Sequence, residues 1–260
     1  MSEQLKLTYI GGPTALLEFG GVRLLTDPTF DAAPRAYSPG PYTLRKTMSP
    51  AIDADAVEEV DAVLLSHDHH FDNLDEAGRA FLKRAGKVLT TAAGAQRLGG
   101  NAVALAPYET ATVTNARGDA ITITATPARH GPVNGARGPV IGFVLSSGNS
   151  AGGDVYVSGD TVWYEGTAEV AKKVSVKVAI LFMGAARVAE VGPAHLTMTG
   201  EEGVEAARAF GESVIVPLHF EGWQHFSEGR EAISAAFEKA GMGNRLRWPE
   251  AGRTLVIGDI

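Results

Sequence analysis

The seven histidines of this 260-residue chain all lie outside the segments that the sequence predicts to be strands or helices. Three of them, at positions 67, 69 and 70, directly follow the apolar run Val60–Leu65, and His219 follows the run 214–217. His130 comes shortly after a predicted strand that ends near Ala125. Polar side chains at strand ends can converge in space while the strands stay apolar, and functional sites are commonly built on such loops. The chain is therefore expected to form a sheet-based fold with its chemistry at one edge.

Short segments of strand character, separated by turns that contain glycine, run through the whole chain. We predict strands at residues 5–10, 14–19, 22–25, 60–65, 87–91, 102–105, 110–114, 120–125, 140–146, 154–158, 178–182, 213–217 and 254–257. Helices are predicted at 75–84, 164–173, 199–210 and 230–240. The third helix begins at a capping box formed by Thr199 and Glu202, which we interpret as helix initiation alone.

Residues 31–50 contain four prolines and two tyrosines, and they are predicted to form a long irregular loop that shapes a binding pocket. The chain has no repeat and no linker rich in proline or serine. A single domain over residues 1–260, with β-sheets in the centre and helices outside, is the expected organisation.

Composition narrows the classes of partner and site. The net charge is −7 and no run of Lys or Arg is present, so nucleic acid is not an expected partner. The chain has no cysteine, which excludes disulfides and thiolate ligands. Neither a signal-peptide pattern nor an apolar run of about 20 residues is visible, so we expect a cytoplasmic protein without a transmembrane segment. The expected partner is a small-molecule substrate, and a homo-oligomer is one option for the assembly.

The segment Ser66–Asp75 holds three histidines and three aspartates in ten residues. Asp160 also follows a predicted strand, although on its own it is equally typical of an Asx-turn. Imidazole nitrogens and carboxylates bind Zn²⁺, and Mn and Fe take similar ligands. We therefore expect one or two divalent metal ions, with Zn as the first choice and Mn or Fe as alternatives. A lone histidine such as His225 is more often structural or exposed to solvent.

On these residues the chain resembles the metallo-β-lactamase superfamily, and more closely its branch of ascorbate-6-phosphate-lactonase-like and N-acylphosphatidylethanolamine-phospholipase-like proteins. The likeness covers residues 7–223, and the ordered set of segments is more specific than any single motif. Its parts are the opening hairpin from Leu7 to Pro28, the His-x-His-x-Asp-His-like segment within Ala62–Asp75, the third-histidine segment Thr126–Gly131, the aspartate segment Ser158–Thr161, the segment His195–Met198 and the last-histidine segment Pro217–Phe220.

The resemblance implies an α/β fold, a four-layer αββα sandwich in which two mixed β-sheets are flanked by helices. By the same resemblance, His130 completes the ligands of a first metal, Asp160 bridges two metals and His219 serves the second. His195 would face the active site. It would position the substrate or protonate the leaving group, a substrate-binding role that His225 and Asn73 would share.

The first motif departs from the family pattern. The chain reads His67-Asp68-His69-His70-Phe71-Asp72-Asn73, which has one residue too many for His-x-His-x-Asp-His. Three registers are open: His67 with His69, Asp68 with His70, or His67 with His70 around a one-residue insertion. The last is favoured, with His69 as the rival ligand and Asp72 as a metal ligand or as the group that orients the attacking water. Asn73 stands where the family has its last motif histidine, so the second metal position could be absent, looser or adapted to another metal.

Together these features predict a metallo-hydrolase in which metal-bound hydroxide attacks an ester, lactone or phosphodiester. The alternative is a metal-binding protein of the same fold with a redox or non-catalytic role, which the substitution at Asn73 favours. A β-lactamase is less favoured than a lactonase-like enzyme. A third hypothesis, a β-sandwich interaction domain with incidental histidines, predicts no metal binding.

Overall fold

Two β-sheets packed face to face form the centre of the computed structural model, which describes residues 4–134, 136–148 and 153–258. The first sheet has the strand order β15 (Thr254–Ile257), β1 (Leu5–Gly11), β2 (Thr14–Phe19), β3 (Val22–Thr26), β6 (Ala62–Leu64), β7 (Lys87–Thr90) and β8 (Ala102–Ala104). The second has the order β14 (Val214–Leu218), β13 (Val176–Phe182), β12 (Asp154–Val157), β11 (Ile141–Ser147), β10 (Ala120–Pro127) and β9 (Thr110–Thr114). Both sheets are mixed, because each contains parallel and antiparallel pairs.

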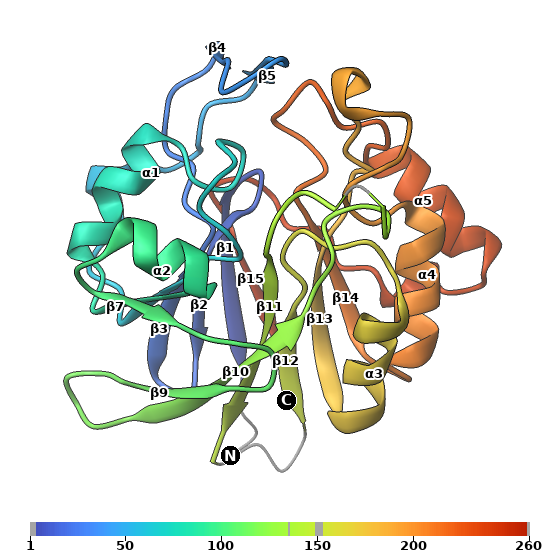
Figure 1. Cartoon of the computed structure of the whole chain (residues 1–260). Helices are drawn as coiled ribbons and strands as arrows, with labels where there is room; N and C mark the ends of the chain where they lie inside the picture. The colour runs from blue at the N-terminus through green and yellow to red at the C-terminus, as the bar shows by residue number, and fades with distance from the viewer. Residues whose placement is uncertain (1–3, 135, 149–152, 259–260) are drawn as a thin grey trace.

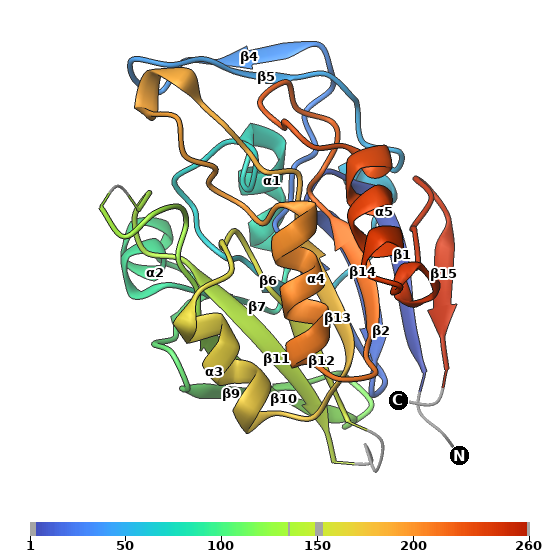
Figure 2. The same cartoon turned by 90° about the vertical axis from the view of Figure 1, so that its right-hand side faces the viewer.

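Helices cover the two outer faces of this sandwich (Figures 1 and 2). On one side lie α1 (Glu76–Phe81), its 3₁₀ extension η2 (Leu82–Arg84) and α2 (Ala92–Leu98), and on the other lie α3 (Glu165–Lys173), α4 (Gly200–Ala209) and α5 (Arg230–Lys239). Short 3₁₀ turns occupy η1 (Ala54–Ala56), η3 (Ala189–Val191) and η4 (Gly243–Arg245). The expected αββα sandwich is therefore confirmed. No helix in the described ranges is long and apolar enough to cross a bilayer.

Three apolar clusters correspond to these layers. The largest lies between the sheets and includes Leu7, Leu64, Phe143 and Ile180, each fully buried. A second joins the outer face of the second sheet to α3, α4 and α5, and a third joins the first sheet to α1 and η2. Apolar side chains on both faces of the central strands explain why runs such as β13 lack polar alternation.

Two predictions of local structure were wrong. Residues 31–50 contain a two-stranded sheet, β4 (Arg35–Tyr37) paired with β5 (Leu44–Lys46), where we expected an irregular loop. Helix α2 was not predicted, because Gly94 and the following Gly99-Gly100 are poor helix formers. It forms because the Thr91 hydroxyl accepts a hydrogen bond from the Gly94 N–H, which caps the helix at its first turn.

The loops after the parallel strands gather at one edge of the sandwich. Strands β3 and β6 are parallel neighbours in the first sheet, as are β12, β13 and β14 in the second, and β10 runs in the direction of β12. Their carboxyl ends therefore meet at the same edge, beneath the β4–β5 pair (Figure 1). This topology brings the histidine-bearing loops of both sheets together.

Candidate metal centre

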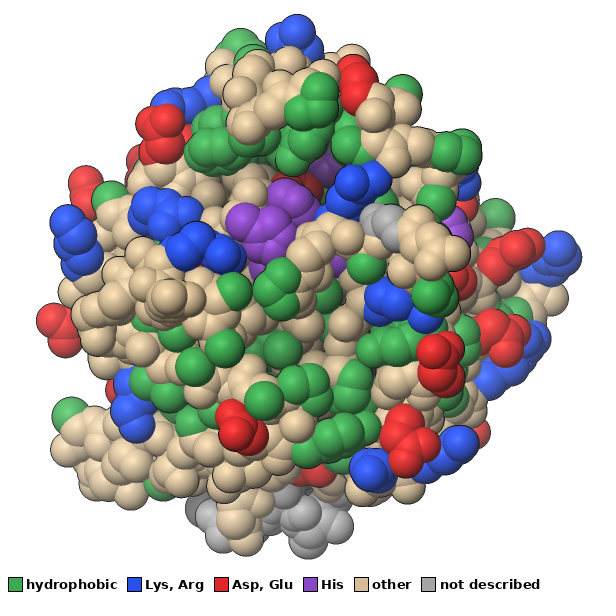
Figure 3. Space-filling view, viewed as in Figure 1, with side chains coloured by type: hydrophobic (Ala, Val, Ile, Leu, Met, Phe, Trp, Pro, Cys, Tyr) green, Lys and Arg blue, Asp and Glu red, His purple; other side chains and the backbone are tan. Residues whose placement is uncertain are grey.

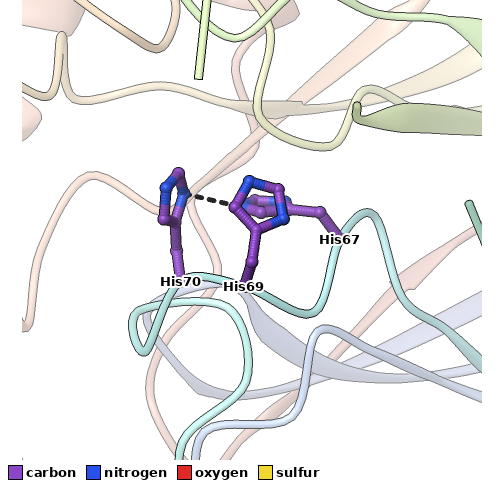
Figure 4. Close-up of side chains that lie close together, drawn as sticks. All are labelled: His67, His69 and His70. Carbon is purple, nitrogen blue, oxygen red and sulfur yellow. Dashed lines mark hydrogen bonds between the residues drawn. The ribbon is translucent and has the colours of Figure 1, made fainter. Parts of the chain in front are cut away.

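Three imidazole nitrogens converge on one point at this edge. His67 Nε2 lies 2.9 Å from His70 Nδ1, and His70 Nδ1 lies 3.2 Å from His130 Nε2 (Figure 4 shows the first pair). His67 and His70 come from the loop between β6 and α1, whereas His130 follows β10. Asp160, at the end of β12, places Oδ2 3.5 Å from His130 Nε2. The four donors form an uninterrupted chain of close contacts.

Hydrogen bonds on the far side of two of these rings fix the direction of their lone pairs. His130 Nδ1 donates to the Leu196 carbonyl at 2.8 Å, so the lone pair of Nε2 faces the site. The Ser66 hydroxyl donates to Asp27 and accepts from His67 Nδ1, so the lone pair of His67 Nε2 also faces inward. His70 Nδ1 can offer a proton to only one of them. Such a convergence of lone pairs fits a bound cation.

A second set of donors lies on the other side of Asp160. His219 Nε2 is 3.4 Å from Asp160 Oδ1 and 3.6 Å from Asp72 Oδ2. Asp160 and His219 are fully buried, and neither carboxylate oxygen of Asp160 nor either ring nitrogen of His219 has a hydrogen-bond partner in the described residues. Buried charged groups without partners are costly, and a divalent cation between them would satisfy both.

The spacing of both sets matches metal coordination. A tetrahedral Zn²⁺ with bonds of about 2.0–2.2 Å holds its donor atoms about 3.3–3.6 Å apart. The separations around His70 and around His219 fall within a few tenths of an ångström of that edge length. Asp160 contributes one oxygen to each set, which is the arrangement of a bridging carboxylate. The residues present therefore fit one or two metal ions.

Burial controls the protonation of the first set. Desolvation, followed by the proximity of His130, lowers the pKa of His70 to about 3. Burial and the neighbouring His70 likewise lower the pKa of His67 well below its usual value. Both rings are thus neutral at physiological pH, which is the form that binds a metal.

In the second donor set the histidine is protonated in the metal-free protein, because two carboxylates surround it. Burial alone would lower the pKa of His219, but Asp160 and Asp72 outweigh it and raise that pKa to about 10. Burial would raise the pKa of Asp160, yet the paired His219 holds it well below the usual range. In the metal-free protein a protonated His219 therefore compensates the two carboxylates.

The remaining motif histidine, His69, points to the side of this set (Figure 4). Its Nε2 donates to the Arg137 carbonyl at 2.7 Å, while its Nδ1 is buried without a hydrogen-bond partner among the described residues. His69 is close enough to His67 and His70 to count as a rival donor. However, only His70 has a nitrogen in contact with both His67 and His130.

His195 is not among the convergent donors, and its expected role towards the substrate stays a prediction. Its Nε2 is 3.1 Å from Glu202 Oε1, and this hydrogen bond raises its pKa. The capping box is confirmed, since Thr199 accepts from the Glu202 N–H and Glu202 Oε2 accepts from the Thr199 N–H. The interpretation as helix initiation alone was incomplete, because Glu202 also holds His195 at the start of α4.

Asp27 is a functional residue that the sequence did not single out. Its Oδ1 accepts from both the Ser66 N–H and the Ser66 hydroxyl, so it supports the orientation of His67. Burial and the nearby Asp160 raise the pKa of Asp27. Asp27 and His219 are also two of the four non-glycine residues with positive φ in the described ranges, a strained geometry that concentrates at functional sites.

A cleft opens above these donors, and the space-filling view shows histidine side chains in a hollow with apolar groups above it and Lys or Arg side chains on either side (Figure 3). The residues that line it are Tyr42, Leu44, His70, Asp72, His130, Arg137, Ala186, Val188, Val191, Leu196 and His225. Five of these are aliphatic, and Arg137 is the one Lys or Arg among them. The cleft suits a small substrate with an apolar part that reaches the donors at its floor.

Comparison with known proteins agrees with this architecture. Residues 22–220 match the family model described as the Beta-lactamase superfamily domain. UPF0173 protein YddR of Bacillus subtilis is 24% identical over 96% of this chain and 99% of its own length. A UPF0173 metal-dependent hydrolase of Aeropyrum pernix is 27% identical over 83% of this chain and 82% of its own.

Among solved structures, the isothiocyanate hydrolase from Delia radicum gut bacteria superposes with a TM-score of 0.80 at 23% identity. The match covers 97% of this chain and 99% of that one, and it concerns the fold. The family model spans most of the chain, including every residue from Asp27 to His219 described above. The chain therefore belongs to the metallo-β-lactamase superfamily.

Proposed function

We propose that this metallo-hydrolase cleaves a carboxylic ester or lactone with an apolar acyl part, and that His67, His70, His130 and Asp160 hold the first metal. Asp72, Asp160 and His219 would hold the second. The observation that carries the proposal is the pair of donor sets that share Asp160 at the floor of an apolar cleft. A divalent metal there supplies Lewis acidity and brings the pKa of a water it binds towards about 7.

The residues of the chain divide the remaining tasks. Asp72 accepts from His225 at 3.0 Å and lies at the cleft, so it can orient an attacking water. Burial, helped by the nearby Asp72, raises the pKa of Tyr42, whose hydroxyl therefore stays a hydrogen-bond donor to substrate. Arg137 donates from one Nη to the Val191 carbonyl, and its buried Nε has no hydrogen-bond partner in the described part of the chain. The Nε of Arg137 is thus available to a carbonyl or carboxylate of the substrate.

The aliphatic wall favours esters and lactones over phosphodiesters. A phosphodiester is charged throughout the reaction, and a site for it usually gathers several cationic donors. Arg137 is the one Lys or Arg side chain among the residues that line the cleft. The fold is compatible with a cytoplasmic enzyme.

Chelation tests this function. Protein stripped of metal is expected to lose hydrolysis of p-nitrophenyl butyrate and of a γ-lactone, and to regain it when Zn²⁺, Mn²⁺ or Fe²⁺ is restored. Bis(p-nitrophenyl) phosphate should be a much poorer substrate. Faster turnover of the phosphodiester would overturn the substrate class. Absence of all hydrolysis by the metal-loaded protein, with oxygen consumption by its iron form, would favour the redox alternative.

The two metal positions should respond differently to pH. The pKa of His219 in the folded, metal-free protein is about 10, above its ordinary 6.5, so the ring keeps a proton below pH 10 and loses it as pH rises. Binding at the second position must displace that proton, and its affinity should rise by up to about tenfold per pH unit between pH 7 and 10. His70, with a pKa of about 3, imposes no such cost at the first position. Competitive chelator titrations at pH 7.0 and 8.5 measure both affinities. A steeper rise of metal affinity with pH at the first position than at the second would contradict the assignment.

A further inference from the structure

His225 occupies a place that neither the family motif nor a lone surface histidine explains. Its Nε2 lies 3.0 Å from Asp72 Oδ2, its side chain is 9% exposed, and its Nδ1 is buried without a hydrogen-bond partner in the described residues. We propose that His225 is the fourth donor of the second metal position and replaces the histidine that the family carries where this chain has Asn73. The inference rests on the proposed function, since it completes the second of the two metal positions.

The donor contacts are symmetrical about the shared carboxylate. On the first side the chain of contacts runs His67, His70, His130 and Asp160, with separations of 2.9, 3.2 and 3.5 Å. On the second side it runs His225, Asp72, His219 and Asp160, with separations of 3.0, 3.6 and 3.4 Å. With His225 included, the second chain of contacts also has four donors, and neighbouring donors in both chains lie within a few tenths of an ångström of the about 3.3–3.6 Å edge of a tetrahedral ion. Without it, the second position has only three.

Asn73 does not supply the missing donor. Its side chain is fully buried, and neither its amide nitrogen nor its amide oxygen makes a hydrogen bond within the described ranges. The Asn73 amide therefore makes no hydrogen bond to Asp72, whereas His225 Nε2 lies 3.0 Å from that carboxylate. The backbone N–H of Asn73 donates to the His70 carbonyl, which fixes the residue in the turn that precedes α1. Asn73 thus stabilises the turn of this loop through its backbone.

The segment that carries His225 is held in place before any metal binds. The Arg187 N–H donates to the His225 carbonyl at 2.8 Å, and the Gln224 N–H donates to the Arg45 carbonyl at 3.0 Å. The Phe226 ring packs against both His225 and His219, with centroids 4.7 and 4.8 Å away. A ring fixed in this way is preorganised as a ligand, since little conformational freedom remains to be lost on binding.

A supporting role for His225, in which it only orients Asp72, makes a different prediction. Loss of a residue that positions a ligand weakens metal binding about 10–100-fold but leaves the set of donor atoms unchanged. Loss of a donor removes one ion from the protein and changes the absorption spectrum of a substituted Co²⁺ ion. His225→Gln separates the two roles, because its amide N–H can still donate to Asp72 while the imidazole donor is gone.

The experiment compares wild type, His225→Ala, His225→Gln and a matched control, His195→Ala, which removes a histidine that pairs with Glu202 outside the cleft lining. Each protein is saturated with Zn²⁺, dialysed and analysed for metal, and the Co²⁺ forms are compared by absorption. We expect two ions per chain in wild type and His195→Ala. Both His225 variants should hold one, with the Co²⁺ bands of the second position lost.

Two ions in His225→Gln with an unchanged Co²⁺ spectrum would overturn the proposal, whatever the folding of His225→Ala. One ion in wild type would also overturn it, while metal-dependent ester hydrolysis at the first position would still stand. Failure of hydrolysis in the chelation experiment, with two ions bound in wild type and one in the variants, would instead reject the proposed function and retain this ligand.

Discussion

Asp160→Asn is expected to lose the second metal entirely, weaken the first and lower kcat/KM for the ester about 1,000-fold. Asp160 Oδ2 lies 3.5 Å from His130 Nε2, and Oδ1 lies 3.4 Å from His219 Nε2, so the one carboxylate faces both positions. The amide keeps the shape but has one oxygen and no charge, and groups that act as a unit fail together when one is removed. The measurements are the metal content per chain and the steady-state kinetics of ester hydrolysis.

Asp119→Asn is the matched control for that variant, because it makes the same chemical change on the exposed hairpin between β9 and β10. It should keep wild-type metal content and turnover. Full metal content in Asp160→Asn would show that Asp160 is only an Asx-turn residue, and the two donor sets would then be unconnected.

The second prediction with a large effect tests whether His69 or His70 is the metal ligand that acts with His67. His70→Ala should lose the first metal and at least about 100-fold in kcat/KM, because His70 is the residue in contact with both His67 and His130. His69→Ala should keep both metals, since the main link of His69 is to the Arg137 carbonyl. Its expected change is in KM, through the cleft wall that Arg137 forms.

The two alanine variants control for each other, as both remove an imidazole from the same loop. Elemental analysis and kinetics on the pair decide between the registers. The reverse pattern, with metal lost in His69→Ala and kept in His70→Ala, would assign the ligand to His69.

Much of the fold could be predicted because its signals are local. Thr199 and Glu202 form a capping box that predicts the start of α4. The apolar run of β13 predicts a strand that is buried on both faces. Helix α2 was harder to predict, because its glycines weaken the local signal and part of its stabilisation comes from a tertiary contact. Arg97 in its last turn pairs with the buried Asp68 of the histidine loop, and that partner is 29 residues away in sequence.

The sequence named most of the residues that the structure brings together at the candidate site, but not their geometry. Sequence reasoning left three registers open for the first motif, because spacing alone cannot show which ring nitrogen faces His130. It gave His195 a place at the site, and the structure shows this ring in contact with Glu202 and not among the residues that line the cleft. It overlooked Asp27, whose only signal was a carboxylate at the end of an apolar strand, the same signal that identified Asp160.

Anomalous X-ray scattering from crystals of the metal-loaded protein tests the central claim most directly, because it reports the number, identity and ligands of the ions together. We predict two peaks about 3.5–4 Å apart with Asp160 between them. The first should lie against His67, His70 and His130, and the second against Asp72, His219 and His225. No peak at this edge of the sandwich, or one that lacks Asp160 as a ligand, would contradict the account.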